Sequence, residues 1–160
     1  MKDATLCLII ENNEILLAMK KRGFGMGKWN GVGGKVDKED SSIIQAAIRE
    51  TKEEIGIDAN ELEKVALLRF RFPYKEDWNQ NVHVFLIKKW QGQPQESEEM
   101  FPKWFKISDI PYQKMWDDDK FWLPSILEGK KVDADFIFKE GEIIEKKTIR
   151  TYRQKTRQQC

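Results

Sequence analysis

Cysteine and long apolar runs are scarce in this chain of 160 residues. The two cysteines are Cys7, within an apolar stretch, and Cys160, at the last position, and their spacing gives neither a disulfide framework nor a zinc site. No stretch approaches the roughly 20 apolar residues of a membrane span, and the first residues do not read as a secretory signal. We therefore expect a reduced, cytoplasmic protein with no membrane partner.

An excess of charge of one sign is also missing, because 28 basic and 27 acidic residues leave a formal net charge of +1. This balance creates no overall field that would attract nucleic acid, so a site for a polyanion must be local. The chain closes on a basic stretch without acids, residues 153–160. We expect this tail to be a disordered terminus rather than a nucleic-acid-binding arm.

The apolar content of 40% is sufficient for one domain with a real core, which we assign to residues 1–152. Segments 42–56 and 121–127 have helical character, because apolar residues recur there at helical spacing. Strands are predicted from short β-rich apolar runs at 5–10, 15–19, 65–72, 82–86 and 103–107, and from a last hairpin over 135–148. The mixture predicts an α+β fold, with α-helices flanking a mixed β-sheet.

Residues 22–34 contain six of the ten glycines, a density that suits a loop whose backbone closely approaches a ligand. The helix that follows is predicted from a capping box, Ser42 with Gln45, and from Gly56 at its end. Its apolar stripe consists of Ile44, Ala47, Ile48, Thr51 and Ile55.

A second stripe of this helix gathers Glu50, Glu53 and Glu54, and we expect it to border the core rather than lie inside it. Like charges at about 4 Å repel by about 4 kcal/mol at an effective dielectric of about 20, and a cation would remove that cost. Clustered carboxylates beside a glycine loop are what Mg²⁺ bound to a polyphosphate requires. The alternative is a charged helix face with Arg49 and Lys52 as counter-ions.

The stretch Arg49-Glu-Thr-Lys-Glu-Glu-Ile-Gly-Ile57, preceded by Gly33-Gly34, resembles the Nudix box, whose core reads Arg-Glu-apolar-any-Glu-Glu-any-Gly-apolar. Thr51 departs from the apolar position. The family also has a glutamate nine residues before the position of Glu50, where Ser41 stands in this chain. The loop is one residue longer here, which leaves Glu39 or Asp40 as substitutes. The resemblance implies the Nudix fold, an α/β/α sandwich around a mixed sheet.

The resemblance extends over residues 5–150 to the MutT-type, animal-type oxidised-purine nucleoside triphosphatases, through residues 19–36, 82–85, 96–100 and 115–119. It implies a monomeric 8-oxo-dGTP diphosphatase that hydrolyses oxidised purine nucleoside triphosphates to the monophosphate and pyrophosphate and so sanitises the nucleotide pool. The implied cofactor is Mg²⁺, with Mn²⁺ as a substitute. Two alternatives stay open: a Nudix pyrophosphatase for another nucleoside diphosphate-linked substrate, and a non-catalytic nucleotide-binding module.

By the same resemblance, the metal would be held by the carbonyl of Gly33 and by Glu50, Glu53, Glu54 and Glu99. Arg49 would orient these glutamates through charge-assisted hydrogen bonds. Glu53 or Glu54 would accept the proton of the attacking water.

The resemblance also implies a base pocket built from other segments. Asn30, Asp118 and Asp119 would contact the polar edge of the purine, because two acids in an apolar pocket tend to share one proton and can then both donate and accept. Trp116 would stack on the ring. The walls would be Leu6, Phe24, Phe70 and Phe72, with polar contacts from Thr5 and Lys20, whereas Trp29, Trp104 and Trp122 are assigned to packing.

Overall fold

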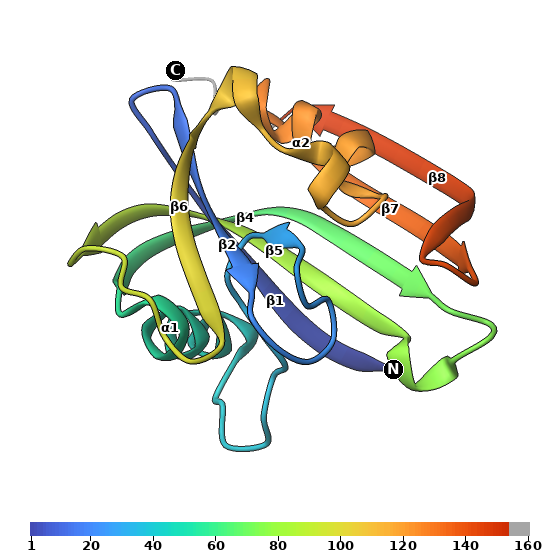
Figure 1. Cartoon of the computed structure of the whole chain (residues 1–160), viewed down its shortest axis with the longest axis horizontal. Coiled ribbons are helices and arrows are strands. Elements are labelled where there is room, and N and C mark those ends of the chain that lie inside the picture. Colours follow the sequence, from blue (N-terminus) through green and yellow to red (C-terminus); the bar gives the residue numbers. More distant parts are fainter. Residues whose placement is uncertain (154–160) are drawn as a thin grey trace, which may run out of the picture.

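Hydrogen bonds between neighbouring strands join eight strands into one mixed sheet in the computed structural model, which describes residues 1–153 (Figure 1). The elements are β1 (Lys2–Glu11), β2 (Glu14–Lys20), β3 (Trp29–Asn30), α1 (Ile43–Ile55), β4 (Asp58–Arg71), β5 (Gln80–Gln91), β6 (Met100–Lys106), α2 (Asp119–Leu127), β7 (Lys130–Lys139) and β8 (Ile143–Arg153). The short 3₁₀ helices are Glu76–Trp78, Ile107–Asp109 and Tyr112–Lys114. The predicted α+β class is confirmed.

The strand order is β3-β2-β1-β5-β4-β7-β8, and β6 pairs with β2. β1 runs parallel to β5, and β4 runs parallel to β7, whereas the other neighbouring strands are antiparallel. The predicted hairpins over β1–β2 and β7–β8 both form. The sheet is therefore mixed, as the sequence indicates.

The two helices cover opposite faces of the sheet. Because successive side chains of a strand point to opposite sides, neighbouring residues of one strand face different helices. On β1, Leu6 and Leu8 belong to the core cluster that includes Trp122 of α2. Cys7 and Ile9 belong to the other cluster, which includes Ala47 of α1. Two cores on either side of one sheet give the layered arrangement that the family resemblance implies.

The boundaries of α1 agree with the predicted signals. The Ser42 hydroxyl accepts a hydrogen bond from the amide of Gln45 at 3.1 Å, and Gly56 ends the helix in the left-handed conformation, at a φ of 73°. One position of the predicted apolar stripe is wrong, because Ile44 in the first turn is 44% exposed while Ala46 is fully buried. Periodicity alone does not indicate where a helix begins to be covered by the rest of the chain.

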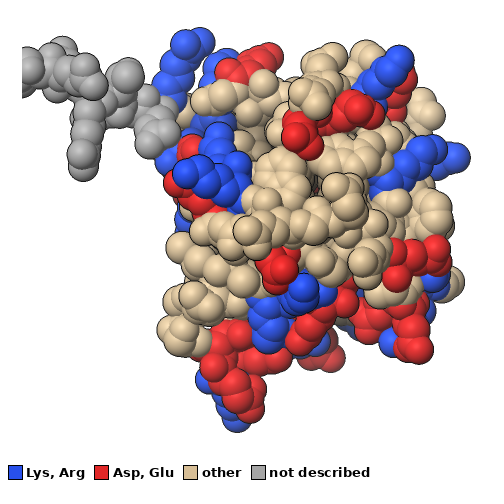
Figure 2. Space-filling view, turned by 90° about the vertical axis from the view of Figure 1, so that its left-hand side faces the viewer, with Lys and Arg blue, Asp and Glu red and all other residues tan. Residues whose placement is uncertain are grey.

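Charged groups of both signs are mixed around an uncharged central area on the face shown in Figure 2. Within residues 1–153, no helix has the length and apolar character needed to cross a membrane. β8 includes Arg153, the first residue of the predicted tail. The rest of that tail, residues 154–160, lies outside the described residues.

Candidate functional site

Most of the predicted site residues line one cavity of about 580 Å³. Its floor is the face of the sheet that carries Leu6, Leu68 and Val82, and its walls come from the glycine loop, α1 and the start of α2. The predicted site residues that line it are Thr5, Lys20, Phe24, Asn30, Gly33, Glu50, Glu54, Phe70, Phe72, Glu99, Trp116, Asp118 and Asp119. Arg49 and Glu53 lie outside this lining.

Aromatic rings form one end of the cavity. Trp116 lies 5.0 Å from Phe24, and Phe72 lies 6.4 Å from Trp116, measured between ring centroids. Phe24 is 43% exposed and also contacts Trp78 at 4.6 Å. This end of the cavity therefore offers flat apolar surfaces of the kind on which a planar ring stacks.

Two adjacent carboxyl groups lie at the α2 side of this end, each about 2% exposed. Asp118 accepts a hydrogen bond from the Trp122 indole at 2.7 Å. Oδ2 of Asp119 is buried and has no hydrogen-bond partner among residues 1–153. Burial raises the pKa of both groups, most strongly that of Asp119, which also faces the charge of Asp118, whereas the indole hydrogen bond opposes the rise for Asp118.

The unpartnered oxygen of Asp119 points to a missing hydrogen-bonding group, because a buried polar atom without a partner is costly. Asn30 lines the same cavity, and its side-chain oxygen accepts from the amide of Gly31 at 2.9 Å. Its NH₂ group donates to no atom of residues 1–153 and remains a donor for a ligand. The pair of acids and this amide can together contact a ring that carries both donors and acceptors.

The hydroxyl of Thr5 contacts the glycine segment. The side chain is 3% exposed, and its hydroxyl lies 3.3 Å from both the amide and the carbonyl oxygen of Gly34. Thr5 therefore fixes the glycine segment to β1, and because it also lines the cavity, its polar contact with a substrate stays a prediction.

One member of the acidic stripe of α1, Glu54, lies deeper than predicted. Glu54 is only 6% exposed, Glu50 is partly buried, and Glu53 is the exposed member. The reason is the segment Gly33-Gly34, which covers this side of the helix: the Gly33 amide donates to Glu54 at 3.1 Å. Burial raises the pKa of Glu54 to about 8 and raises that of Glu50, against the opposing effects of Gly33 and Arg49.

Close contact between this segment and the helix requires glycine. A Cβ at Gly34 would lie 2.6 Å from the Glu50 carboxyl carbon, and one at Gly33 would lie 1.9 Å from the Thr5 carbonyl oxygen. Any side chain at either position would push the loop away from α1 or from β1. The glycine pair and the glutamates are therefore one packed unit.

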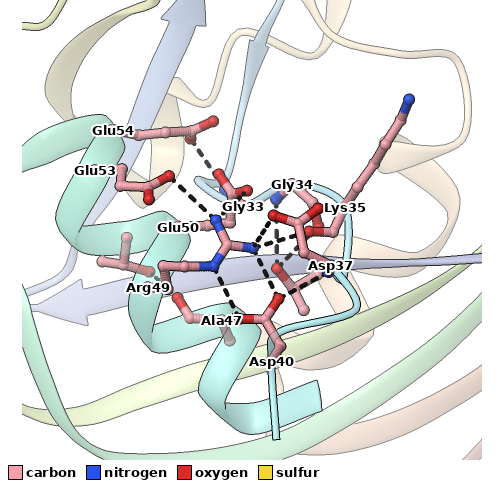
Figure 3. A network of polar contacts seen from close by, with 12 residues as sticks. Gly33, Gly34, Lys35, Asp37, Asp40, Ala47, Arg49, Glu50, Glu53 and Glu54 are labelled. Atoms are coloured by element: carbon pink, nitrogen blue, oxygen red, sulfur yellow. Dashed lines mark hydrogen bonds and ion pairs between the residues drawn. The ribbon is translucent and has the colours of Figure 1, made fainter. Parts of the chain in front are cut away.

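Arg49 lies at the centre of a polar network beside the glutamates (Figure 3). Its guanidinium donates to Glu50 at 3.0 Å and to Glu53 at 3.1 Å. It also forms two hydrogen bonds with the carboxylate of Asp40, at 2.8 and 2.9 Å, which hold the pKa of Asp40 at about 2. Of the two substitutes left open for the missing glutamate, Asp40 therefore makes the contact with Arg49.

The residues around this network suit a divalent cation. The carbonyl of Gly33 accepts no hydrogen bond from residues 1–153, although the carbonyls of Val32 and Gly34 on either side bond to β1. Carbonyl and carboxylate oxygens are the donors that Mg²⁺ and Mn²⁺ prefer. The burial of Glu54 is a cost that a bound cation would relieve.

The glutamates contact protein donors in this arrangement. Glu50 and Glu53 face Arg49, Glu54 faces the Gly33 amide, and Glu99 faces Arg22 at 3.3 Å. Across residues 1–153, no three acidic, histidine or cysteine side chains are grouped closely enough to hold a metal ion. The donor set fits a divalent cation in its chemistry, and each carboxylate is paired with a protein donor in this structure.

A second cavity, of about 310 Å³, adjoins the first along the acidic helix. Glu50, Glu54 and Glu99 line both cavities. Glu53, which is absent from the lining of the larger cavity, lines the smaller one. The carboxylates therefore lie between an aromatic cavity and a charged one.

Sequence reasoning missed three contributors to the site. Trp122 was assigned to packing, but it also orients Asp118, and the signal is their i, i+4 spacing at the start of a helix. Gln80 lines the aromatic cavity, and Lys28 lies 5.3 Å from the Trp116 ring. No pattern in the sequence marks these two, because strand pairing and the loop path bring them there.

Comparison with known proteins gives a consistent result. The NUDIX domain model matches residues 1–126. The oxidized purine nucleoside triphosphate hydrolases of Danio rerio and Mus musculus are 44% and 42% identical, and each alignment covers 88% of this chain and 88% of the relative. A crystal structure of a MutT protein from Bacillus halodurans superposes with a TM-score of 0.82, at 21% identity, over 93% of this chain and 97% of that one. The latter likeness concerns the fold alone.

Proposed function

The chain belongs to the NUDIX family, and on that premise we propose that it hydrolyses oxidised purine nucleoside triphosphates, such as 8-oxo-dGTP, to the monophosphate and pyrophosphate. The observation that carries the proposal is the buried Asp118–Asp119 pair, with its unpartnered oxygen, in an aromatic cavity that continues to the acidic helix. The names of the two vertebrate relatives support the same substrate class.

The aromatic cavity would bind the base. Trp116 and Phe24 supply flat surfaces for stacking, and the acids supply a donor and an acceptor. Burial raises the pKa of both acids and so favours the neutral form, and an acid that holds its proton can donate it in a hydrogen bond to the base. A purine with an added oxo group changes its pattern of donors and acceptors, and a proton that can reside on either acid would accommodate more than one oxidised purine.

The acidic helix would serve the phosphates. Glu50, Glu53, Glu54, Glu99 and the Gly33 carbonyl would hold Mg²⁺, with Mn²⁺ as a substitute, and such a cation neutralises phosphate charge and lowers the pKa of a bound water. Hydrolysis breaks the anhydride bond between the α- and β-phosphates and adds one water, whose proton Glu53 or Glu54 accepts. Arg49 positions Glu50 and Glu53 through its hydrogen bonds.

We also propose that the protein is a monomer, that it acts in the cytoplasm on a free nucleotide, and that it has no nucleic-acid partner. The absence of a large excess of charge supports the last point, since the net charge is +1. Light scattering of the purified protein should give the mass of one chain, and a dimer mass would contradict the monomer.

The test is turnover on 8-oxo-dGTP compared with dGTP, ADP-ribose and dinucleoside polyphosphates, each with Mg²⁺. We expect kcat/KM for 8-oxo-dGTP to exceed that for dGTP, because the added oxo group changes the pattern of donors and acceptors that the acids and Asn30 contact. A preference for ADP-ribose would contradict the substrate class while leaving the NUDIX chemistry intact. Binding without turnover of any of these compounds would indicate a non-catalytic nucleotide-binding module.

A further inference from the structure

The lining of the smaller cavity includes one basic side chain to which the proposed function gives no role. Its charged lining consists of Glu50, Glu53, Glu54, Glu98, Glu99 and Arg22, and among residues 1–153 Arg22 is the only basic side chain in that lining. Arg22 does not line the larger, aromatic cavity. A lone guanidinium among five carboxylates requires an explanation.

The two cavities define a direction for an elongated ligand. The aromatic rings and the Asp118–Asp119 pair lie at the far end of the larger cavity, and the shared Glu50, Glu54 and Glu99 mark its junction with the smaller one. A nucleoside in the aromatic end therefore directs its phosphate chain across the shared carboxylates. A water occupies about 30 Å³ of liquid, so the 310 Å³ of the smaller cavity leave room for a diphosphate group with several waters.

We infer that Arg22 binds the β- and γ-phosphates of the triphosphate, and later the pyrophosphate product, in the smaller cavity. This inference rests on the proposed function. A guanidinium is suited to the role, because its planar set of donors matches two phosphate oxygens at once. Within residues 1–153, the other basic side chain near the shared carboxylates is Lys20, which lies 4.0 Å from Glu99 and lines the larger cavity and not the smaller one.

The present partners of Arg22 leave it free to make this contact. Its guanidinium lies 3.3 Å from Glu99 and 3.7 Å from Glu98, and the side chains of Arg22 and Glu98 are 60% and 88% exposed. Ion pairs as exposed as these contribute little to stability, so exchanging them for a phosphate is inexpensive. The same exchange frees Glu99 from Arg22 and leaves it with Lys20 at 4.0 Å, and the proposed function requires Glu99 as a metal ligand.

Lys21 offers a matched control one residue away. It also carries a positive charge toward the segment before β6, where it forms an ion pair with Glu96 and donates to the Ser97 carbonyl at 2.9 Å. It lines neither cavity. Lys21→Ala therefore removes one charge from the same surface, and the contact with Ser97 of the cavity lining, without removing a side chain that lines the proposed phosphate site.

The experiment compares wild type, Arg22→Ala, Arg22→Lys and Lys21→Ala. Calorimetry with Mg²⁺ measures the Kd of inorganic pyrophosphate and of 8-oxo-dGMP, and steady-state assays give KM and kcat for 8-oxo-dGTP. We expect Arg22→Ala to weaken pyrophosphate binding about 10- to 100-fold, as the loss of a charged hydrogen-bonding partner does, and to raise KM in parallel. Arg22→Lys should recover part of the loss. The Kd of 8-oxo-dGMP should change less than about twofold, and Lys21→Ala should match wild type.

Three results would overturn the inference: unchanged pyrophosphate binding in Arg22→Ala, an equal loss in Lys21→Ala, or an equal loss of 8-oxo-dGMP binding in Arg22→Ala. The first leaves Arg22 without a phosphate contact, the second indicates a general effect of charge, and the third indicates a disturbed loop. In each of these cases wild type still hydrolyses 8-oxo-dGTP and the proposed function stands. If wild type neither binds 8-oxo-dGMP nor releases pyrophosphate, the proposed function fails, and the inference fails with it.

Discussion

The acidic helix and the base pocket differ in the groups that contact their buried carboxyls. At α1, Glu50 and Glu53 are balanced by the guanidinium of Arg49, and Glu54 by a backbone amide. At α2, Asp118 and Asp119 are more deeply buried, and no cation contacts them among residues 1–153. Carboxylates beside a guanidinium suit a metal site, and Glu54, whose pKa burial raises to about 8, would be held in its charged form by a bound cation. A buried carboxyl pair without a basic neighbour suits hydrogen bonds to an uncharged base.

We expect the largest loss of activity when a glutamate of the acidic helix is replaced by a neutral residue. Glu54→Gln keeps the shape of the side chain but removes the charge that would bind the cation or accept the proton. Since a general base contributes about 10²- to 10⁴-fold, we expect kcat for 8-oxo-dGTP to fall by about that factor while the Kd of 8-oxo-dGMP is retained. The measurement is release of pyrophosphate with Mg²⁺.

Glu61→Gln on β4 is the control, because Glu61 is exposed and lines neither cavity. Its turnover should equal that of wild type. Glu53→Gln in the same assay identifies the proton acceptor: the variant with the larger loss of kcat at saturating Mg²⁺ lacks it. Full activity in Glu54→Gln would exclude a role for Glu54.

In the base pocket, replacing an aspartate by asparagine should alter the selectivity between oxidised purines. Asp118→Asn and Asp119→Asn each fix the position of a donor, so one oxidised purine should lose more affinity than another. Hydrogen bonds to charged groups are worth about 1.5–3 kcal/mol, which corresponds to a loss of roughly 10- to 150-fold in kcat/KM for the affected base. The measurement compares 8-oxo-dGTP with an oxidised adenine nucleotide over a range of pH. Equal losses for every nucleotide would mean that the pair is merely structural.

A smaller effect is expected where a residue only positions the glutamates. Asp40→Ala removes the paired hydrogen bonds that orient Arg49, and we expect kcat to fall about 10-fold, since outer partners of metal ligands typically contribute 10- to 100-fold. Asp40→Glu should restore part of the activity, and a higher Mg²⁺ concentration should compensate for the loss. The neighbouring Glu39→Ala is the control, and a loss of the same size there would contradict the role of Asp40.

The smallest expected effect concerns stability without metal. Glu54, Asp118 and Asp119 have folded-state pKa values above their unfolded ones, so the folded state binds more protons between those values. The free energy of unfolding should therefore fall as the pH rises from about 4 to about 8. One unit of pKa corresponds to about 1.4 kcal/mol, or roughly 3 °C in Tm for a chain of this size.

Glu54→Gln removes one of these groups, and its Tm at pH 8 without metal should exceed that of wild type by several degrees. The two proteins should have similar Tm values at pH 4, where Glu54 is protonated. Thermal unfolding followed by circular dichroism at both pH values makes the comparison. A variant that is less stable than wild type at pH 8 would show that the burial of Glu54 carries no electrostatic cost.

The two regions also differ in how far the sequence predicts them. The caps of α1, the hairpins and the acidic stripe follow from local patterns, and these predictions are correct for Ser42 and Gly56. The predicted position of Glu54 at the border of the core is wrong, because the segment Gly33-Gly34 covers this side of the helix. The hydrogen bond from the Gly33 amide to Glu54, 21 positions apart in the sequence, shows this contact. Periodicity describes one helix and contains no information about what packs on it.

The base pocket could not be derived from spacing at all. Asn30, Phe72 and Asp119 come from three separate segments, and only the family resemblance grouped them before the fold was known. The bond from Trp122 to Asp118 and the position of Gln80 depend on tertiary packing. Asp40 is intermediate, since the sequence restricted the choice to two neighbouring acids and the loop path selected one.

The central claim is that the acidic stripe of α1 tolerates its own repulsion because a divalent cation and a triphosphate chain bind against it. Its most direct test is pyrophosphate release from 8-oxo-dGTP by the wild-type protein as a function of Mg²⁺ concentration, with metal binding measured in parallel. The account predicts no release without metal, saturable release with it, and loss of both binding and release in Glu54→Gln. A wild-type protein that binds neither Mg²⁺ nor Mn²⁺ and releases no pyrophosphate from any nucleotide would contradict it.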